Sequence, residues 1–300
     1  PPHSARRAGI AARPPGIRAP SLEALPLLRV ALMPIVPPLF DIHCHLLPGI
    51  DDGAESWEES LAMARLAAAD GIQAVIVTPH QLGAFSHNTG EAIRTRTAAL
   101  ARFLAEHEVP PEALPRAAVR IQPQPAAEVA AGRVVSLGDH RRHLLLELPH
   151  ELYLPLEPVL EELAAAGIAG VLSHPERNQG LLRQPKRLRD LVAKGCLMQV
   201  TAGSLMGTFG PGPRQLAEWM LREGFVHFLA TDAHGSQARR PLLRRAWERT
   251  AEVCGEENAT LLCSQNPAAI CRGEGEIRPM QVPIRASGWT NWLTGLRRAG

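Results

Sequence analysis

Seven short apolar runs alternate along the chain with segments of helical periodicity, and this alternation restricts the fold more than any other feature. Most runs are followed by an interval in which apolar residues recur at spacings of three and four. Several of these intervals close on a glycine, which readily caps a helix end. Repeated strand and helix units predict parallel strands covered by helices. The expected strands are residues 38–43, 73–78, 118–122, 143–148, 170–173, 197–201 and 226–231.

Histidines and carboxylates stand at or near the ends of five of these runs. Imidazoles and carboxylates are the usual ligands of first-row metal ions, and core packing does not explain so many of them there. A closed barrel fits better than an open sheet, because only a ring of strands would converge these ends on one point. The stretches are Asp41-Ile-His-Cys-His45, Thr78-Pro-His80, Glu147, His174-Pro-Glu-Arg177 and Thr231-Asp-Ala-His234.

Spacing and burial make some of these residues stronger candidates than others. His43 and His45 stand two apart on a strand, which puts both imidazoles on one face. Asp232 and His234 repeat that spacing after the last strand. Glu147 lies inside an apolar run, where burying an unpaired carboxylate is costly unless a cation compensates for its charge.

Other candidates are weaker when each is taken alone. The turn Asp51-Asp52-Gly53 offers two oxygen ligands over the first strand end, and either aspartate could serve, although such a sequence is more often only a turn. His80 after its strand suits a structural role. Arg177 suits a surface ion pair, but its planar fork also matches two phosphate oxygens.

Composition excludes several classes of partner. The chain has 32 basic and 30 acidic residues and a net charge of +2, so no global field draws it to nucleic acid or anionic lipid. No apolar stretch reaches the roughly 18 residues of a membrane-spanning helix. Five irregularly spaced cysteines without a Cys-x-x-Cys pair indicate neither a disulfide scaffold nor a zinc knuckle, and favour a cytoplasmic location.

Both ends of the chain differ from the region between them. Residues 1–37 are rich in Pro, Ala and Arg and are expected to be a disordered or misannotated extension, with translation starting at Met33 as one hypothesis. Residues 276–300 are expected to be a poorly ordered tail. No linker interrupts residues 38–275, which we interpret as one domain.

Taken together, the motifs resemble the polymerase and histidinol phosphatase (PHP) superfamily over about residues 38–272. The stretches 41–53, 174–178 and 201–210 are similar to its capsular-polysaccharide branch, the bacterial manganese-dependent protein-tyrosine phosphatases. This resemblance implies a distorted seven-stranded (β/α) barrel of the TIM-like PHP type, with three metal ions at its carboxyl-end mouth. It also implies a role in capsular or exopolysaccharide biosynthesis.

The resemblance assigns a ligand set to each ion by position. Manganese is the implied metal, and the mixed nitrogen and oxygen donors also suit zinc or iron. One ion would be held by His43, His45, Glu128 and Asp232. A second would share Glu128 as a bridge and add Glu147 and His174, and a third would take Asp52, His80 and His234.

A mechanism follows from the chemistry of such clusters. A hydroxide that bridges two metal ions would attack phosphorus in line, and no phosphoenzyme is required. By family position, Arg177 and Arg240 would grip the phosphate. His234 or a metal-bound water would protonate the leaving phenolate. The implied partner is a phosphotyrosine-containing protein, namely a tyrosine kinase that controls polysaccharide export.

Three alternatives to this function need separate consideration. A small-molecule phosphatase of the same superfamily, acting on histidinol phosphate or a sugar phosphate, would use the same metals. A non-catalytic regulator could keep the metals for stability alone. A cysteine-based tyrosine phosphatase is disfavoured, because the chain contains no Cys-x5-Arg sequence and residue 50, six after Cys44, is Ile50.

Overall fold

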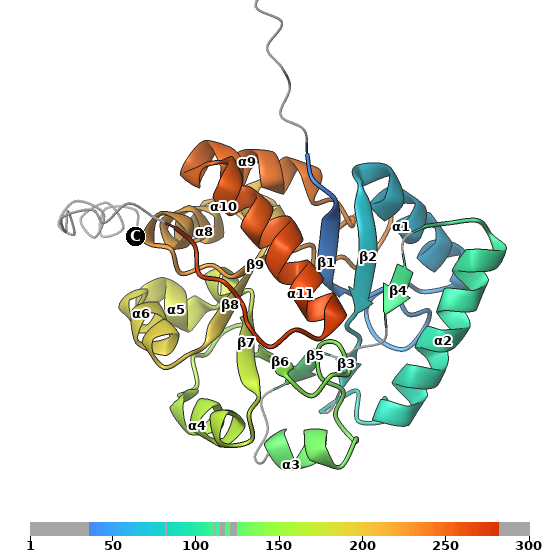
Figure 1. Ribbon diagram of the computed structural model, residues 1–300, viewed down its shortest axis with the longest axis horizontal. Helices are drawn as coiled ribbons and strands as arrows, with labels where there is room; N and C mark the ends of the chain where they lie inside the picture. Colours follow the sequence, from blue (N-terminus) through green and yellow to red (C-terminus); the bar gives the residue numbers. More distant parts are fainter. Residues whose placement is uncertain (1–35, 82, 111, 115–117, 121–124, 282–300) are drawn as a thin grey trace, which may run out of the picture. The chain divides into compact units, whose positions relative to one another are not determined.

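Parallel strands separated by helices run through residues 36–281 of the computed structural model, which describes this range apart from residues 82, 111, 115–117 and 121–124. Most of the two expected tails, residues 1–37 and 276–300, lies outside the described residues. The described part of the chain belongs to one compact unit, in which the strands lie in the middle and helices surround them (Figure 1).

All seven predicted runs contribute a strand, and two further strands are short. The strands are β1 (Leu39–Cys44), β2 (Ile72–Val77), β3 (His80–Gln81), β4 (Glu112–Leu114), β5 (Ala118–Arg120), β6 (His143–Glu147), β7 (Ala169–Ser173), β8 (Leu197–Thr201) and β9 (Phe228–Ala230). The helices are α1 (Trp57–Asp70), α2 (Gly90–Glu106), α3 (Pro125–Ala130), α4 (Glu157–Ala165), η1 (Pro175–Arg177), α5 (Gln179–Arg183), α6 (Lys186–Ala193), α7 (Ala202–Leu205), α8 (Pro211–Glu223), α9 (Arg244–Cys254), α10 (Glu256–Thr260), η2 (Leu261–Gln265) and α11 (Asn266–Arg272). Within these residues, no helix combines the length and the apolar character needed to cross a membrane.

Helix α1 shows how the sequence sets the ends of an element. The Ser56 side chain accepts a hydrogen bond from the Glu59 backbone N–H at 3.2 Å and caps the first turn. Gly71 ends the helix with a φ of 95°, a left-handed conformation that glycine adopts without strain. This glycine is of the kind that the sequence predicts at helix ends.

The described strands form two parallel sheets rather than one closed ring. The first sheet has the order β1-β2-β4 and the second the order β3-β5-β6-β7-β8-β9. Residues Thr78 and Pro79 separate β2 from β3, and proline cannot continue a ladder because it lacks an N–H. The predicted parallel α/β architecture is confirmed, whereas the closed seven-stranded barrel is not seen in the described residues.

Two contacts nevertheless connect the outer strands of the sheets. Cys44 of β1 forms a parallel bridge with Ala233, just after β9, and the His45 N–H donates to the Ala233 carbonyl at 2.9 Å. The core has two parts. A large apolar cluster lies between strands and helices, and a small one collects inward side chains of five strands. The small cluster contains Ile42, Ile76, Leu137, Leu145, Val171, Phe228, Ala230 and Ile270.

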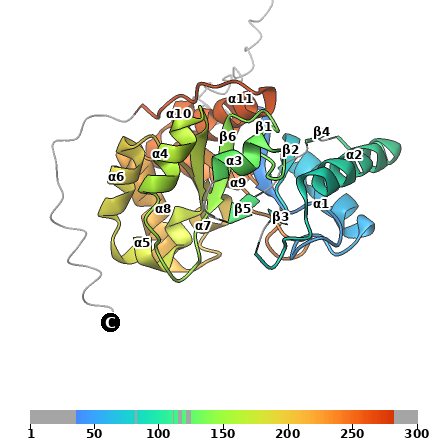
Figure 2. The same ribbon diagram turned by 90° about the horizontal axis from the view of Figure 1, so that it is seen from below.

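The small cluster separates the two ends of the strands. Ile270 of α11 closes it from one side. Figure 2 shows α11 on one side of the strands and the helices α5 and α7, which follow the carboxyl ends of β7 and β8, on the other. The strand ends that carry the candidate ligands therefore lie opposite α11.

Candidate metal centre

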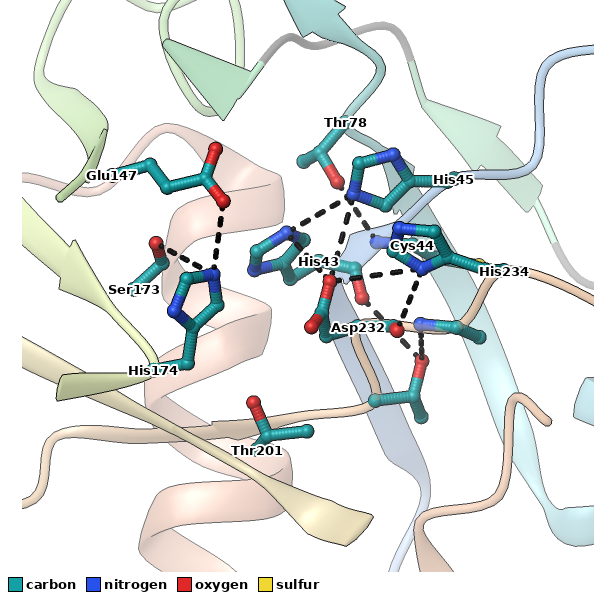
Figure 3. Close-up of polar contacts among 12 residues, drawn as sticks. His43, Cys44, His45, Thr78, Glu147, Ser173, His174, Thr201, Asp232 and His234 are labelled. Carbon is teal, nitrogen blue, oxygen red and sulfur yellow. Dashed lines mark hydrogen bonds and ion pairs between the residues drawn. The ribbon is translucent and has the colours of Figure 1, made fainter. Parts of the chain in front are cut away.

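Eight of the nine predicted metal ligands meet at the carboxyl ends of the strands. Figure 3 shows His43, His45, Glu147, His174, Asp232 and His234 among them. Contacts of 3.2 to 3.9 Å between imidazole nitrogens and carboxylate oxygens link them into one network. All of them are buried or half-buried except Asp52. The eight residues are His43, His45, Asp52, His80, Glu147, His174, Asp232 and His234.

The deepest group joins the end of β1 to the segment after β9. Asp232 Oδ1 lies 3.2 Å from His43 Nε2 and 3.6 Å from His45 Nε2. The two Nε2 atoms are 3.4 Å apart. One ligand atom from each of the three residues fits within 4.8 Å of the others, so a single cation could contact all three.

An amide oxygen and a carboxylate oxygen fix the orientation of these imidazoles. Gln199 Oε1 on β8 lies 2.8 Å from His43 Nδ1, and Asp51 Oδ2 lies 2.7 Å from His45 Nδ1. An acceptor at Nδ1 keeps the proton there and leaves Nε2 as the ligand atom. Gln199 had a signal in the sequence, because it is a polar residue inside an apolar strand.

A second group forms around the loop after β1. Asp52 Oδ1 lies 3.4 Å from His80 Nε2 and 3.5 Å from His234 Nε2. With His45, these residues place four ligand atoms within 4.8 Å of one another. The sequence left open which aspartate of the loop would be a ligand. The structure places Asp52 among the ligands, whereas Asp51 orients His45 and accepts from the His80 N–H at 2.9 Å.

The close approach of this loop to β1 depends on Gly53. A Cβ at that position would come within 2.3 Å of the His45 carbonyl oxygen, a contact that no side chain could make without a backbone shift. The Gly53 N–H donates to Asp51 Oδ1 at 3.0 Å, which completes the turn. The Asp-Asp-Gly turn thus brings both aspartates over the end of β1.

Glu147 connects two imidazoles through its two oxygens. Oε1 lies 3.3 Å from His174 Nε2, and Oε2 lies 3.3 Å from His80 Nδ1. Glu147 Oε2 and His80 Nδ1 are both buried, and neither has a hydrogen-bond partner among the described residues. Buried polar atoms are rarely left without a partner. A cation between them would satisfy both, so these residues fit a metal ion.

Burial and neighbouring charges shift the pKa values of the ligands in opposite directions. Burial lowers the pKa of His43 to about 3. Burial also disfavours the charged form of His45, but its hydrogen bonds to Asp232 and Asp51 raise its pKa to about 10. The pKa of Asp232 lies well below its ordinary range, because the surrounding imidazoles and Arg239 outweigh its burial. The Asp232 carboxylate therefore stays ionised, and negative charge beside imidazole nitrogens is the environment that a divalent cation prefers.

Glu128, the expected bridging ligand, lies outside this network in the structure. It is part of α3, and its two carboxylate oxygens accept from Nε and Nη2 of Arg133, both at 2.7 Å. This planar two-bond pair is satisfied locally, five residues along the chain. The strand between β3 and β6 is β5, whose sequence Ala118-Val119-Arg120 contains no imidazole or carboxylate. Glu147 is the glutamate that connects ligands here.

Two arginines hold the outer oxygen of Asp232, and one of them is not the residue expected. Arg177 Nη1 and Arg239 Nη2 both donate to Asp232 Oδ2, the second at 2.6 Å. Arg240, the residue expected here, is exposed, whereas its neighbour Arg239 contacts Asp232. The sequence contains both arginines side by side. Arg239 turns inward with a φ of 48°, which no sequence pattern indicated.

Buried hydroxyls and a carboxylate attach β1 to its neighbours. Thr78 Oγ1 accepts from the Cys44 N–H at 2.9 Å. Asp41 accepts from the Thr231 and His43 N–H groups at 3.0 and 3.2 Å, and from the Thr231 hydroxyl. Cys44 itself packs in the large apolar cluster, where burial raises the pKa of its thiol well above the usual range. This cysteine therefore packs away from the ligands.

Known proteins share this arrangement of sequence and fold. The profile of the family Capsular polysaccharide synthesis, CpsB/CapC, matches residues 39–272. Tyrosine-protein phosphatase YwqE of Bacillus subtilis is 31% identical over 249 residues, which cover 82% of this chain and 97% of the relative. Tyrosine-protein phosphatase CpsB of Streptococcus pneumoniae is 25% identical over 243 residues, which cover 77% and 98%.

A solved structure agrees with these relatives. A chain from the crystal structures of YwqE from Bacillus subtilis and CpsB from Streptococcus pneumoniae, described as unique metal-dependent tyrosine phosphatases, superposes with a TM-score of 0.77. It is 31% identical and covers 82% of this chain and 100% of its own. Because the family profile spans nearly all of the described residues and a relative of this similarity matches over its full length, this chain belongs to the CpsB/CapC family of capsular polysaccharide synthesis.

Proposed function

We propose that this chain is a metal-dependent tyrosine-protein phosphatase that hydrolyses phosphotyrosine. The observation that carries the proposal is the network of eight ligands, all but Asp52 buried or half-buried, beside two arginines, in a family whose members include named tyrosine-protein phosphatases. Cationic side chains next to a metal centre suit a phosphate monoester, because both stabilise charge on phosphoryl oxygens.

Manganese is the ion that we propose for the centre. Carboxylates and imidazoles without a thiolate suit Mn²⁺, in agreement with the family resemblance. Bound divalent cations would lower the pKa of water and stabilise negative charge on the phosphoryl group. A three-ion cluster would use the groups around Asp232, Asp52 and Glu147. The group around Glu147 has the fewest donors once Glu128 is absent, so we expect its ion to be held most weakly.

Different residues of the site would bind the phosphoryl group and hold the metal ions. Arg177 and Arg239 would bind phosphoryl oxygens and offset the charge of the transition state. Burial lowers the pKa of His234, whose Nδ1 lies 2.9 Å from the Asp232 carbonyl oxygen. A neutral imidazole with its proton on Nδ1 offers Nε2 as a ligand, so we assign His234 to the metal rather than to general acid catalysis. Phenolate leaves with a pKa of about 10 and needs less help from an acid than an alkoxide.

Three finer assignments extend this proposal. The substrate would be a phosphotyrosine-containing protein of polysaccharide export, with a tyrosine kinase as the expected partner. A cytoplasmic location is supported by the buried free thiols of Cys44, Cys196 and Cys263. A closed, distorted (β/α) barrel of seven strands is supported by the bridge between Cys44 and Ala233 and by the small cluster to which five strands contribute.

Metal analysis combined with an activity assay tests the function directly. The protein loaded with Mn²⁺ should hydrolyse p-nitrophenyl phosphate and a phosphotyrosyl peptide, and a chelator should abolish both activities. Elemental analysis should find more than one ion per chain. A metal-loaded protein that cleaves neither compound would contradict the proposal. Faster turnover of histidinol phosphate than of the peptide would instead favour a small-molecule phosphatase.

A further inference from the structure

Phe209, in the turn between α7 and α8, lies against both arginines of the site. The Cζ atom of Arg177 is 4.1 Å from the centre of the phenyl ring, and that of Arg239 is 6.0 Å from it. Both distances fall in the range in which the negative face of an aromatic ring attracts a cation. The same two guanidinium groups donate to one oxygen of Asp232.

The guanidinium groups of Arg177 and Arg239 repel each other, so other contacts must hold them close together. The Asp232 carboxylate supplies one negative partner, but it binds each guanidinium through a single nitrogen. The Nε atoms of Arg177 and Arg239 are buried and have no hydrogen-bond partner among the described residues. Hydrogen bonds therefore leave the planes of both groups incompletely fixed. Among the described residues, the ring of Phe209 lies against both groups and can hold them.

The position of the ring is itself fixed by the residues around it. A Cβ at Gly203 would meet Phe209 Cε2 at 3.2 Å, so the glycine leaves space for the ring against α7. Glu176, next to Arg177 in η1, accepts from the Thr201 N–H at 3.0 Å and from Ser204 Oγ at 2.7 Å. These bonds attach η1 to the segment that leads into Phe209. The arginine and the ring therefore keep a constant relative position.

We propose that Phe209 is a positioning residue whose aromatic face holds Arg177 and Arg239 in place as a preformed clamp for the phosphoryl group. The inference rests on the proposed phosphatase function. A preformed clamp avoids the loss of side-chain freedom that two mobile arginines would suffer when an oxyanion binds. The motif from Thr201 to Gly210 thereby gains a specific role in binding the phosphoryl group.

The test compares Phe209→Leu with Phe209→Tyr in the metal-loaded protein. Leucine keeps an apolar side chain but removes the aromatic face, whereas tyrosine keeps the face. With p-nitrophenyl phosphate as substrate and inorganic phosphate as competitive inhibitor, we expect Phe209→Leu to raise KM and the inhibition constant by about fivefold to thirtyfold. Phe209→Tyr should stay within about twofold of the unchanged protein. Metal content should be equal in all three.

A series of ring-fluorinated phenylalanines at position 209 keeps the test decisive if leucine disturbs the turn. Added fluorine weakens the negative face with little change in shape, so phosphate affinity should fall stepwise. Equal phosphate affinity across this series, or equal losses in the leucine and tyrosine variants, would overturn the positioning role. Such a result in a protein that still hydrolyses p-nitrophenyl phosphate leaves the proposed function intact. A protein without any such activity refutes the function first.

Discussion

Replacing Arg239 by alanine, with Arg240→Ala as the matched control, tests the assignment of the clamp most sharply. Arg239 Nη2 lies 2.6 Å from Asp232 Oδ2, and its side chain is 29% exposed. Loss of one well-placed donor to a developing oxyanion lowers the rate constant by about 10²- to 10³-fold, or about 3 to 4 kcal/mol. Partial exposure screens the charge, so we expect the lower end, about 10²-fold in kcat/KM. Arg240 is exposed and should matter by less than about twofold.

Hydrolysis of a phosphotyrosyl peptide at saturating Mn²⁺ is the appropriate assay. Metal content must be measured for each variant, because Arg239 contacts a candidate ligand and its removal could alter metal binding instead of phosphate binding. A large fall in kcat/KM with unchanged metal content supports the assignment. If Arg240→Ala were the more damaging change, or if Arg239→Ala kept most of its activity, the reasoning from the structure would be refuted.

Three further predictions concern the metal ligands, their support and the response to pH. Glu147→Gln should lose bound metal in elemental analysis and Glu128→Gln should not, since only Glu147 contacts candidate ligands; equal losses would contradict the structure. Gln199→Leu should weaken metal binding about 10- to 100-fold in a competition titration, because it frees His43 to rotate. Burial lowers the pKa of His227 to about 4. The unfolded chain therefore binds the extra proton between about pH 6.5 and 4, so in chelator-treated protein the contribution of His227 to the free energy of unfolding should fall by about 3 kcal/mol as the pH falls through that window. In urea titrations, the free energy of unfolding of His227→Gln should decrease less between about pH 6.5 and 4 than that of the unchanged protein.

The strands and their ligand-bearing ends were predictable because both depend on local patterns. Short apolar runs between turn signals indicate strands without reference to distant residues. A carboxylate inside such a run, as at Glu147, needs a compensating cation. The strands β3 and β4 were missed because they contain two and three residues, too few to show a period. The break at Thr78 and Pro79 was visible in the sequence, but its consequence, a strand divided between two sheets, depends on neighbouring strands.

The structure places Glu128 and Arg240 outside the contacts that the family resemblance implies for them. Both were assigned by family position. Glu128 lies five residues from Arg133, which binds its carboxylate, and Arg240 follows directly after Arg239, which contacts Asp232. Arg133 binds the Glu128 carboxylate through two parallel hydrogen bonds. Because the two residues are only five apart, bringing them together costs little chain entropy. Whether Arg239 or Arg240 faces the site depends on one backbone torsion. Side-chain periodicity contains no information about either outcome.

The positive φ of Arg239 was not predictable from the sequence, because it is one of several strained backbone conformations at the site. Among the described non-glycine residues, six have positive φ, and three of them belong to the site: His174 at 36°, Asp232 at 51° and Arg239 at 48°. Such conformations cost about 1 to 3 kcal/mol each and persist only where the surroundings hold them. The His174 N–H donates to the Gln199 carbonyl and the Asp232 N–H to the His43 carbonyl, both at 2.8 Å.

A third hydrogen bond holds the remaining strained residue. The His234 N–H donates to the Arg239 carbonyl at 2.9 Å, which closes the loop that turns Arg239 inward. A strand that continued regularly would point successive side chains to opposite faces. The left-handed residues instead turn the chain sharply at the strand ends, so that a ligand and an arginine from one short segment face the same mouth, as His174 and Arg177 do. Glycine would relieve the strain at each position but would remove the side chain that the strain directs toward the centre.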